Sequence, residues 1–355
     1  MAGIEAMIGV NYGMMADNLP PPENVANFLA DSTIINRVRL FDANPYMLQA
    51  FAHTKLAITI TIPNLLIPQF TNLTFAQEWI NTNISTHIRF TNIIRILVGN
   101  EVLSTGNKLL ITYLVPAMQT LHRALLAAAL DRKIQISTPH SLGVLSSSSP
   151  PSSGIFRQGY DEHVFRPLLK FLRDTGSPFI INPYPFFDTS NETLNYALFM
   201  PNHGVFDYNT NVNYTNMLDA QLDSVFCAMK RLGFDDVDIV IGETGWPSQG
   251  DPLQVGVDPQ CAAVYNANLV RHVTSGVGTP LMLNRTFETY VFALFDEDLK
   301  FGPTFERHFG LFGPNLTPKY NVGLLKPSLG VIVCPTITAW YWLVAGLLCV
   351  NLMAL

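Results

Sequence analysis

Two glutamates, Glu101 and Glu243, have sequence surroundings that suit a reactive carboxyl group. Glu101 lies in the string VGNEV at residues 98–102, and Glu243 lies in GETGWPS at residues 242–248. Each string ends or directly follows a short, apolar, β-branched run of the kind that forms a buried strand. A glutamate is ordinarily a solvated loop residue or a helix cap. Two glutamates set among glycines and apolar residues at strand ends are better explained as groups that point into a cleft.

Paired carboxyl groups across a cleft indicate glycoside hydrolysis. One carboxyl must stay protonated near neutral or mildly acidic pH to protonate the leaving oxygen. The other must be ionised to attack the sugar or stabilise its developing positive charge. Asn100, directly before Glu101, could hydrogen-bond a sugar 2-hydroxyl, where such bonds strengthen in the transition state. We therefore interpret Glu101 and Glu243 as a candidate catalytic pair and Asn100 as a candidate substrate-binding residue.

The elements that must position these residues form a regular alternation. Eight apolar, β-branched runs span residues 8–12, 35–41, 56–62, 93–98, 134–138, 179–184, 237–242 and 290–295. Amphipathic stretches between them include residues 109–130, 163–173, 217–232 and 259–274. This alternation predicts a single (β/α)8 barrel, in which reactive side chains follow the carboxyl ends of strands. A doubly wound open sheet would usually carry a glycine-rich phosphate turn after an early strand, and the sequence has none.

At these positions the chain resembles plant β-1,3-glucanases of glycoside hydrolase family 17, whose barrels carry glutamates after strands four and seven. The resemblance spans nearly the whole of the barrel predicted over residues 8–326. The matching strings are IGVNYG at 8–13, RLFD at 39–42, STPHS at 137–141, NPYPFF at 182–187, FDEDLK at 295–300 and ERHFGLF at 306–312, with the two glutamate strings. The string GETGWPS is highly specific, and GNE alone is moderately so.

The resemblance implies a role for each member of the pair. Glu101 would be the acid/base and Glu243 the nucleophile of a retaining mechanism that cleaves β-1,3-glucan internally, with neither a cofactor nor a metal. It also implies that Glu297, Lys300 and Glu306 form a charged cluster beside the pair. A lysine between two carboxylates stays charged and can tune the pKa of a neighbouring acid. The other interpretation of the cluster is an ion-pair network at the barrel rim.

Aromatic residues at the strand ends offer faces on which sugars could stack. The candidates are Tyr184, Phe186, Phe187 and Trp246. Any one of them taken singly could instead pack the top of the barrel. We expect Tyr184, Phe186 and Trp246 to contribute to substrate binding.

Two other functions remain open at this point. A β-1,3-glucan transglycosylase would use the same covalent intermediate and pass the sugar to another glucan in place of water. A non-catalytic surface protein would bind glucan or callose without cutting it. The sequence does not choose between hydrolase and transglycosylase, because water access to the intermediate depends on loop shape.

Composition limits the partners that the chain can bind. Only 14% of residues are charged and the net charge is −6, so there is no electrostatic basis for nucleic-acid binding. The four cysteines have no metal-ligand spacing. Cys227 and Cys261 could form a disulfide in a secreted protein or could be two buried thiols. We expect a monomer whose ligand is a polysaccharide.

The two ends of the chain raise the question of location. Residues 1–7 (MAGIEAM) lack the basic and apolar regions of a signal peptide. Residues 327–355 contain no charged residue and are long enough to cross a bilayer. This tail predicts either a signal for glycosylphosphatidylinositol (GPI) attachment or a retained membrane anchor. We therefore expect the enzyme at the outer face of the plasma membrane or in the cell wall.

Six Asn-x-Ser/Thr sequons occur in the chain. They begin at Asn72, Asn83, Asn191, Asn213, Asn284 and Asn315. These tripeptides become glycosylation sites only if the chain enters the secretory pathway.

Overall fold

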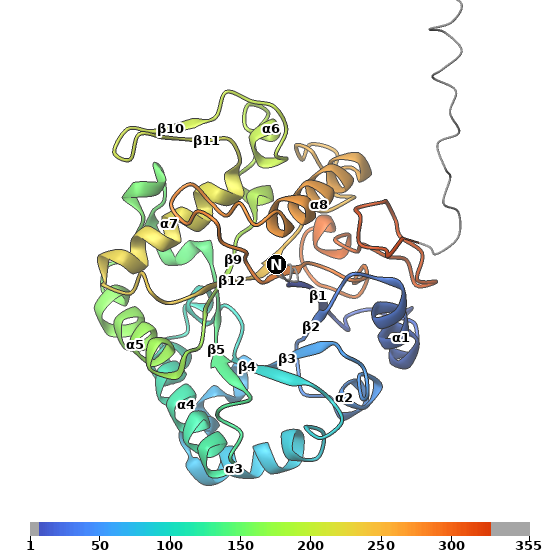
Figure 1. Cartoon of the computed structure of the whole chain (residues 1–355), viewed down its shortest axis with the longest axis vertical. Coiled ribbons are helices and arrows are strands. Elements are labelled where there is room, and N and C mark those ends of the chain that lie inside the picture. The colour runs from blue at the N-terminus through green and yellow to red at the C-terminus, as the bar shows by residue number, and fades with distance from the viewer. Residues whose placement is uncertain (1–6, 328–355) are drawn as a thin grey trace, which may run out of the picture. The chain divides into compact units, whose positions relative to one another are not determined.

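The computed structural model describes residues 7–327, which fold around a parallel sheet that closes into a barrel (Figure 1). The order of its nine strands is β5-β4-β3-β2-β1-β13-β12-β9-β6. Each pair of neighbours in this order is parallel. Helices surround the sheet in Figure 1, as the alternating sequence pattern requires. The prediction of a (β/α)8 barrel is confirmed.

The elements have the following bounds in the described part of the chain. The barrel strands are β1 (Ile8–Tyr12), β2 (Arg37–Leu40), β3 (Ala57–Ile62), β4 (Ile93–Val98), β5 (Gln135–Ser137), β6 (Pro139–Ser141), β9 (Phe179–Asn182), β12 (Ile239–Thr244) and β13 (Thr289–Val291). The α-helices are α1 (Pro22–Ser32), α2 (Pro45–Ala50), α3 (Leu73–Ile80), α4 (Lys108–Ala127), α5 (Arg166–Thr175), α6 (Leu194–Ala197), α7 (Met217–Arg231) and α8 (Pro259–Thr274). Two antiparallel pairs lie outside the barrel: β7 (Leu145–Ser147) with β8 (Ile155–Phe156), and β10 (Val205–Asp207) with β11 (Val212–Tyr214).

The fifth barrel strand is divided into two pieces, β5 and β6, which are the two edge strands of the sheet. β5 pairs with β4 on one side, and β6 pairs with β9 on the other. Only Thr138 separates the two pieces. Nine strands in the sheet therefore correspond to the eight strand runs of the sequence.

The predicted elements agree with the structure at their centres and differ at their ends. The runs at residues 8–12 and 93–98 are observed with the same bounds, and so is the helix at residues 259–274. The eighth strand is shorter than predicted, because β13 ends at Val291. Pro116 lies inside the continuous helix α4 and does not divide it. The hairpins β7–β8 and β10–β11 were not predicted, because their strands are too short to show a clear alternation.

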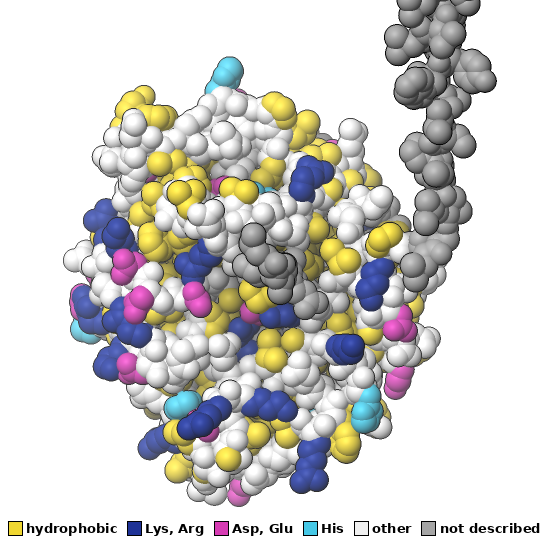
Figure 2. Space-filling model, viewed as in Figure 1, with side chains coloured by type: hydrophobic (Ala, Val, Ile, Leu, Met, Phe, Trp, Pro, Cys, Tyr) yellow, Lys and Arg dark blue, Asp and Glu magenta, His cyan; other side chains and the backbone are white. Residues whose placement is uncertain are grey.

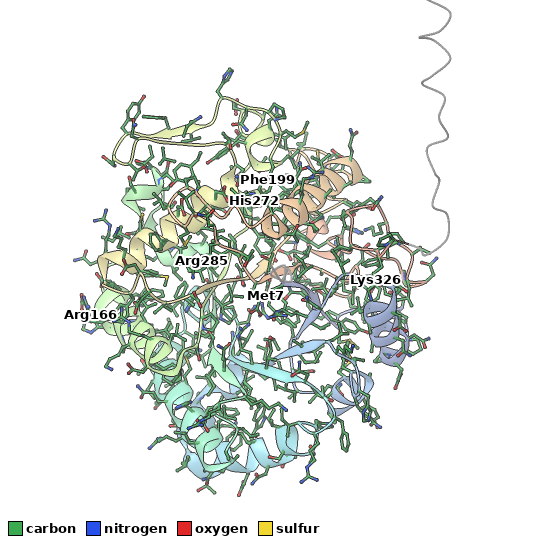
Figure 3. All side chains as sticks on the ribbon, viewed as in Figure 1. Met7, Arg166, Phe199, His272, Arg285 and Lys326 are labelled. Carbon is green, nitrogen blue, oxygen red and sulfur yellow. The ribbon has the colours of Figure 1, made fainter. Side chains whose placement is uncertain are left out.

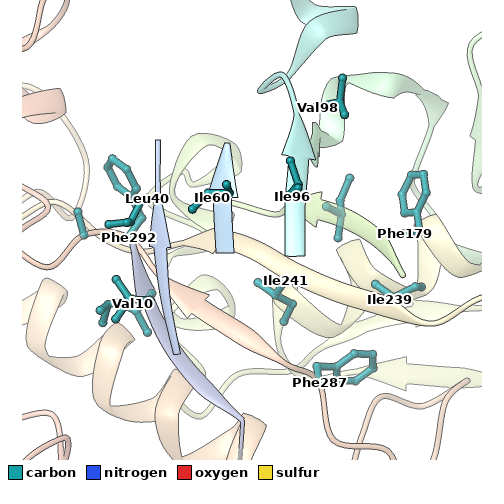
Figure 4. Packing of buried hydrophobic residues seen from close by; sticks show 14 of the residues in the cluster. Val10, Leu40, Ile60, Ile96, Val98, Phe179, Ile239, Ile241, Phe287 and Phe292 are labelled. Carbon is teal, nitrogen blue, oxygen red and sulfur yellow. The ribbon is translucent and has the colours of Figure 1, made fainter. Parts of the chain in front are cut away.

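The main hydrophobic core lies between the strands and the surrounding helices. Figure 4 shows Leu40, Ile60 and Ile96, from three adjacent strands, among its buried side chains. From the helical layer, α4 contributes Leu114 and Leu121, both fully buried. Strands covered on one face by helices and on the other by the barrel interior are apolar along their length, which explains the continuous runs in the sequence.

The barrel interior contains a small apolar layer and a buried ionic cluster. Leu97, Ile180, Val240 and Tyr290 form a cluster of their own. At the amino ends of the strands, the Glu288 carboxylate accepts hydrogen bonds from Arg95 Nη1 at 2.7 Å and from the Tyr290 hydroxyl at 2.7 Å. Arg37 Nε lies 3.5 Å from the same carboxylate. Two arginines therefore balance the charge of the buried carboxylate, and Arg95 and the Tyr290 hydroxyl donate hydrogen bonds to it.

Some expectations concern residues outside the described part of the chain. Residues 1–6 and most of the predicted tail, 328–355, lie there, and so do Cys334 and Cys349. Within residues 7–327, no helix combines the length and the apolar character that a membrane span needs. Cys227 and Cys261 are both free thiols in the structure and are partly buried.

The ionic cluster predicts a large effect of Glu288→Gln on stability. Losing the charge leaves Arg95 buried without its counter-ion, and breaking such a pair costs about 3–5 kcal/mol in the free energy of unfolding. Burial opposes ionisation of Glu288, but Arg95 and Arg37 outweigh it and lower the pKa of this carboxyl. The stabilisation is therefore present above the unfolded pKa of about 4.3 and is lost as pH falls through the lower folded value.

Urea unfolding at neutral pH and at acidic pH tests this expectation. Glu288→Gln should lose most of its deficit relative to the wild type at acidic pH, where the wild-type carboxyl is also neutral. The exposed Glu78→Gln is a matched control and should change the free energy of unfolding by no more than about 0.5 kcal/mol. Equal stability of the two variants at neutral pH would contradict the role given to the cluster.

Candidate active site

A tight turn after β4 sets the position of Glu101. Gly99 has φ of 75°, and a Cβ there would lie 2.5 Å from Val102 Cγ2 and 2.7 Å from Asn64 Oδ1. Glu101 itself is left-handed, with φ of 48° and ψ of 41°, a conformation that costs energy for a residue with a side chain. The Asn64 side chain holds the turn by accepting from Asn100 N at 2.7 Å and donating to Asn100 O at 3.0 Å.

Glu243 lies on β12, next to Gly242, and faces the same cleft as Glu101. A Cβ at Gly242 would lie 2.5 Å from Ile180 Cγ2 and 2.6 Å from Asn182 Oδ1, so the neighbouring strand requires glycine there. The cleft has a volume of about 500 Å³, and both glutamates line it. The structure therefore brings the two glutamates together at the carboxyl ends of their strands.

A buried arginine connects three strand ends beneath this cleft. Arg39, at the end of β2, is only 1% exposed. Its Nη1 donates to Glu243 Oε1 at 2.8 Å and to the Gly242 carbonyl at 3.2 Å. Its Nη2 donates to Asn100 Oδ1 at 2.7 Å. The guanidinium thus fixes the positions of Glu243 and of the residue before Glu101.

Two residues hold the carboxyl groups: Asn182, at the end of β9, and Tyr184, in the loop that follows it. The Tyr184 hydroxyl donates to Glu243 Oε2 at 3.0 Å. Asn182 Nδ2 donates to Glu101 Oε1 at 2.8 Å. Arg39 and Tyr184 each contact a different oxygen of Glu243, so that carboxylate has a fixed orientation. Glu101 and Glu243 therefore lie in chemically different surroundings.

These surroundings make Glu101 an acid near neutral pH. Burial, followed by the negative charge of Glu243, raises the pKa of Glu101 to about 7. The hydrogen bond from Asn182 and the charge of Arg39 act in the opposite direction but do not cancel the increase. Burial and the Glu243 charge also raise the pKa of Tyr184, so its hydroxyl stays protonated and able to donate.

The predicted charged cluster lies beside the pair. Lys300 Nζ lies 3.0 Å from Glu306 Oε2 and 4.6 Å from the centre of the Phe292 ring. Lys300 and Glu306 both line the cleft. Glu297 is buried and accepts from Met15 N at 3.2 Å. Burial raises the pKa of Glu297, while the charge of Lys300 opposes that increase.

Trp246 and Phe186, two of the three aromatic residues expected to bind substrate, do not line the cleft. Trp246 is fully buried, and its indole nitrogen donates to the Gly256 carbonyl at 2.7 Å. Phe186 is 8% exposed and packs edge to face against Trp246, with ring centres 5.4 Å apart. Their rings fill the space behind the barrel mouth. Phe187 is the exposed aromatic of this group, at 57%, and it lines the cleft with Tyr184.

Further residues of the site were not given functional roles from the sequence. Arg39 and Asn182 appeared only within family-like strings, although both lie at strand ends where the barrel rule places reactive groups. A second hollow of about 410 Å³ shares Asn100, Glu243 and Lys300 with the cleft. Met14, Met15, Phe41, Asp42 and Met47 also line it. No sequence pattern predicts this hollow, because it forms between loops far apart in the chain.

The donor set around the site suits hydrogen bonding to a polyol. Carboxyl, amide, hydroxyl and ammonium groups line the cleft together with aromatic rings. Within residues 7–327, no group of three or more His, Cys, Asp or Glu side chains is arranged to hold a metal ion.

Comparisons with known proteins agree with this geometry. A glucan endo-1,3-beta-glucosidase of Triticum aestivum is 52% identical over 334 residues, covering 93% of this chain and 72% of that protein. Glucan endo-1,3-beta-glucosidase 7 of Arabidopsis thaliana is 48% identical over 329 residues, covering 91% of this chain and 65% of that protein. The chain therefore spans about two thirds to three quarters of the length of these two relatives.

Solved structures and a family model agree with these relatives on the family of the chain. The structure of CJP38, a beta-1,3-glucanase and allergen of Cryptomeria japonica pollen, has a TM-score of 0.85 and 39% identity, covering 90% of this chain and 99% of that one. A second solved structure comes from work on two plant beta-glucan endohydrolases with distinct substrate specificities. It has a TM-score of 0.81 and 33% identity, covering 89% of this chain and 100% of that one. The model of glycosyl hydrolases family 17 matches residues 8–324, and the chain belongs to that family.

Proposed function

We propose that this protein hydrolyses internal β-1,3-glucosidic linkages of β-1,3-glucans with retention of configuration. The observation that carries the proposal is the contrast between two carboxyl groups in one cleft. Glu101 has a pKa raised to about 7, whereas Glu243 is held by a buried arginine and a tyrosine hydroxyl. Glycoside hydrolysis requires this division between an acid and a carboxylate. The names of the relatives support β-1,3-glucan as the substrate.

In the proposed mechanism each carboxyl group has a separate task. Glu101 donates its proton to the glycosidic oxygen, and the bond from that oxygen to the sugar C1 breaks. Glu243 attacks C1 and forms a covalent glycosyl-enzyme. Glu101, now ionised, takes a proton from a water molecule, which attacks C1 and releases Glu243. Arg39 and Tyr184 keep Glu243 oriented, and Asn100 hydrogen-bonds the sugar 2-hydroxyl.

The shape of the site supports cleavage within a chain. The cleft extends toward Ser141, Ser148 and Phe187, and the second hollow extends toward Met14 and Met15. A glucan could therefore bind on both sides of Glu243. Because Glu101 lines the first part only, we propose that the leaving portion of the glucan lies there. Phe187, half-exposed beside Tyr184, offers it a stacking face.

Two alternatives use the same surface differently. A transglycosylase would form the same glycosyl-enzyme and transfer the sugar to a second glucan. A callose-binding protein would need the stacking faces but not an acid with a raised pKa. The pKa of Glu101 therefore favours an enzyme over a binder. Products longer than a defined oligosaccharide substrate would indicate the transferase.

We also propose that the protein is a monomer at the outer face of the plasma membrane or in the wall. The domain boundaries then place the barrel in residues 8–326 and a GPI-attachment signal or membrane anchor in residues 327–355. The uncharged, apolar sequence of that tail supports this arrangement.

The tail predicts release of the protein by lipase treatment. A chain given a secretory leader should reach the cell surface and be released by a phosphatidylinositol-specific phospholipase. Deleting residues 329–355 should give a secreted, active barrel. Full-length protein that stays on the membrane after lipase treatment would favour a retained span, and failure of the shortened chain to fold would show that the boundary is wrong.

The two glutamates should give azide products of opposite configuration with an activated β-glucoside. Glu243→Ala removes the nucleophile, so turnover should fall by several orders of magnitude and azide should give an α-glycosyl azide directly. Glu101→Ala keeps the nucleophile, so azide should trap the intermediate as a β-glycosyl azide. Nuclear magnetic resonance of the products distinguishes the two. The same anomer from both variants, or near-normal glucan hydrolysis by either one, would contradict the assignment.

The pKa of Glu101 predicts the alkaline limit of activity. The rate constant kcat/KM should decline above a pH of about 7, as the acid loses its proton. Asn182 donates to Glu101 and favours its ionised form. Asn182→Ala should therefore raise the pKa and move the alkaline limb to higher pH, with a lower maximum rate. Ser141→Ala, elsewhere in the cleft, is the control. A limb that moves to lower pH in Asn182→Ala would overturn the assignment of Glu101 as the acid.

A further inference from the structure

The β10–β11 hairpin exposes an aromatic pair next to a glycosylation sequon. The hairpin stands out from the barrel near α6 and α7 (Figure 1), and hydrophobic side chains lie on the surface in that part of Figure 2. Phe206 is 40% exposed and Tyr208 is 86% exposed. Their ring centres are 4.8 Å apart in an edge-to-face arrangement. Neither residue lines the cleft or the second hollow.

The register of the hairpin places the sequon asparagine on the same face. Phe206 pairs directly with Asn213, which begins the sequon Asn213-Tyr214-Thr215. Side chains of directly opposed residues in an antiparallel pair point to the same face of the sheet. Asn213 and Thr215 are both exposed, whereas Tyr214 is fully buried on the opposite face.

We propose that Asn213 carries an N-linked glycan whose first sugars pack on the Phe206–Tyr208 ring pair. An apolar ring face beside the point of attachment suits the C–H face of a sugar ring, as in other aromatic–sugar contacts. The proposal rests on the outer-surface location proposed above, because the modification occurs only in the secretory pathway.

The chemistry of attachment is compatible with the surroundings of Asn213. Asn213 Nδ2 displaces the pyrophosphate of a polyisoprenyl-pyrophosphate oligosaccharide at C1 of its first N-acetylglucosamine. The N–C1 bond forms, the C1–O bond breaks, one amide proton leaves, and the lipid pyrophosphate departs. The second amide hydrogen remains for the bond from Nδ2 to the His203 carbonyl, now 3.2 Å long. Gly204 leaves room for the amide, since a Cβ there would lie 2.5 Å from it.

The hairpin is anchored on its inner side, so its outer face is a fixed platform. Asp207 is fully buried, and its carboxylate accepts from Ser152 N and Ser152 Oγ, both at 2.8 Å. Asn209 N also donates to it, at 3.0 Å. The two bonds from Ser152 connect the hairpin to the β7–β8 loop. A glycan packed on the outer face would therefore protect the backbone amides of β10 and β11 from exchange with solvent.

The test uses the full chain, given a secretory leader and expressed in a eukaryotic host. Mass spectrometry of peptides measures the occupancy of Asn213, and hydrogen exchange measures the protection of the β10–β11 amides. Asn213 should be occupied, and Asn213→Gln should speed hairpin exchange about fivefold, as expected for loss of a contact of aromatic strength. In a Phe206→Val/Tyr208→Thr background, which keeps strand-forming residues but removes the rings, Asn213→Gln should have little further effect.

The control and the activity assay separate this proposal from the proposed function. Asn191→Gln removes an exposed sequon in another loop and should leave hairpin exchange unchanged. Asn213→Gln should leave glucan cleavage unchanged, whereas a wild-type protein that does not cleave glucan would overturn the proposed function alone. An unmodified Asn213 in the secreted protein would overturn the site. Equal effects of Asn213→Gln with and without the two rings would overturn the packing.

Discussion

The buried guanidinium of Arg39 is the interaction on which the active-site end of the barrel depends. A charge in a protein interior is costly unless it is paired and hydrogen-bonded. Arg39 meets this condition through Glu243, the Gly242 carbonyl and Asn100. These partners come from β12 and from the turn after β4, whereas Arg39 itself lies on β2. Because this one cation needs all of its partners, it holds the ends of the three strands together. A carboxylate held in this way would need no rearrangement to act as the proposed nucleophile.

The two catalytic candidates differ in the partners that contact their carboxyl groups. Burial raises the pKa of Glu101, whose amide partner, Asn182, is neutral and whose neighbour Glu243 is negative. Glu243 is less exposed to solvent than Glu101, at 7%, but a cation contacts it directly. The difference between the proposed acid and the proposed nucleophile therefore arises from which carboxyl the arginine contacts. Arg39 pairs with Glu243, whereas Glu101 accepts its hydrogen bond from Asn182.

The two ends of the barrel interior contain similar ionic groups that serve different purposes. At the amino ends, Glu288 receives Arg95, Arg37 and Tyr290, and the cluster is nearly closed to solvent. At the carboxyl ends, Arg39 is equally buried, but its carboxylate partner, Glu243, lines the cleft.

Contacts between aromatic rings connect loops to the helices around the barrel. Figure 3 labels Phe199 and His272, whose rings, 5.5 Å apart, connect the loop that follows α6 to helix α8.

Sequence alone determined the alternation of strands and helices and the positions of both glutamates. Most strands lie in largely apolar runs, because the barrel buries both of their faces, and reactive residues lie at the ends of such runs. The family strings also located Lys300 and Glu306 at the cleft. Only the tertiary structure decided which aromatic rings face the cleft, since Trp246, Phe186 and Phe187 all follow predicted strands closely but differ in burial. The division of the fifth strand and the partners of Arg39 likewise depend on contacts between residues far apart in the chain. Local periodicity carries no information about such contacts, because they form only when the barrel closes.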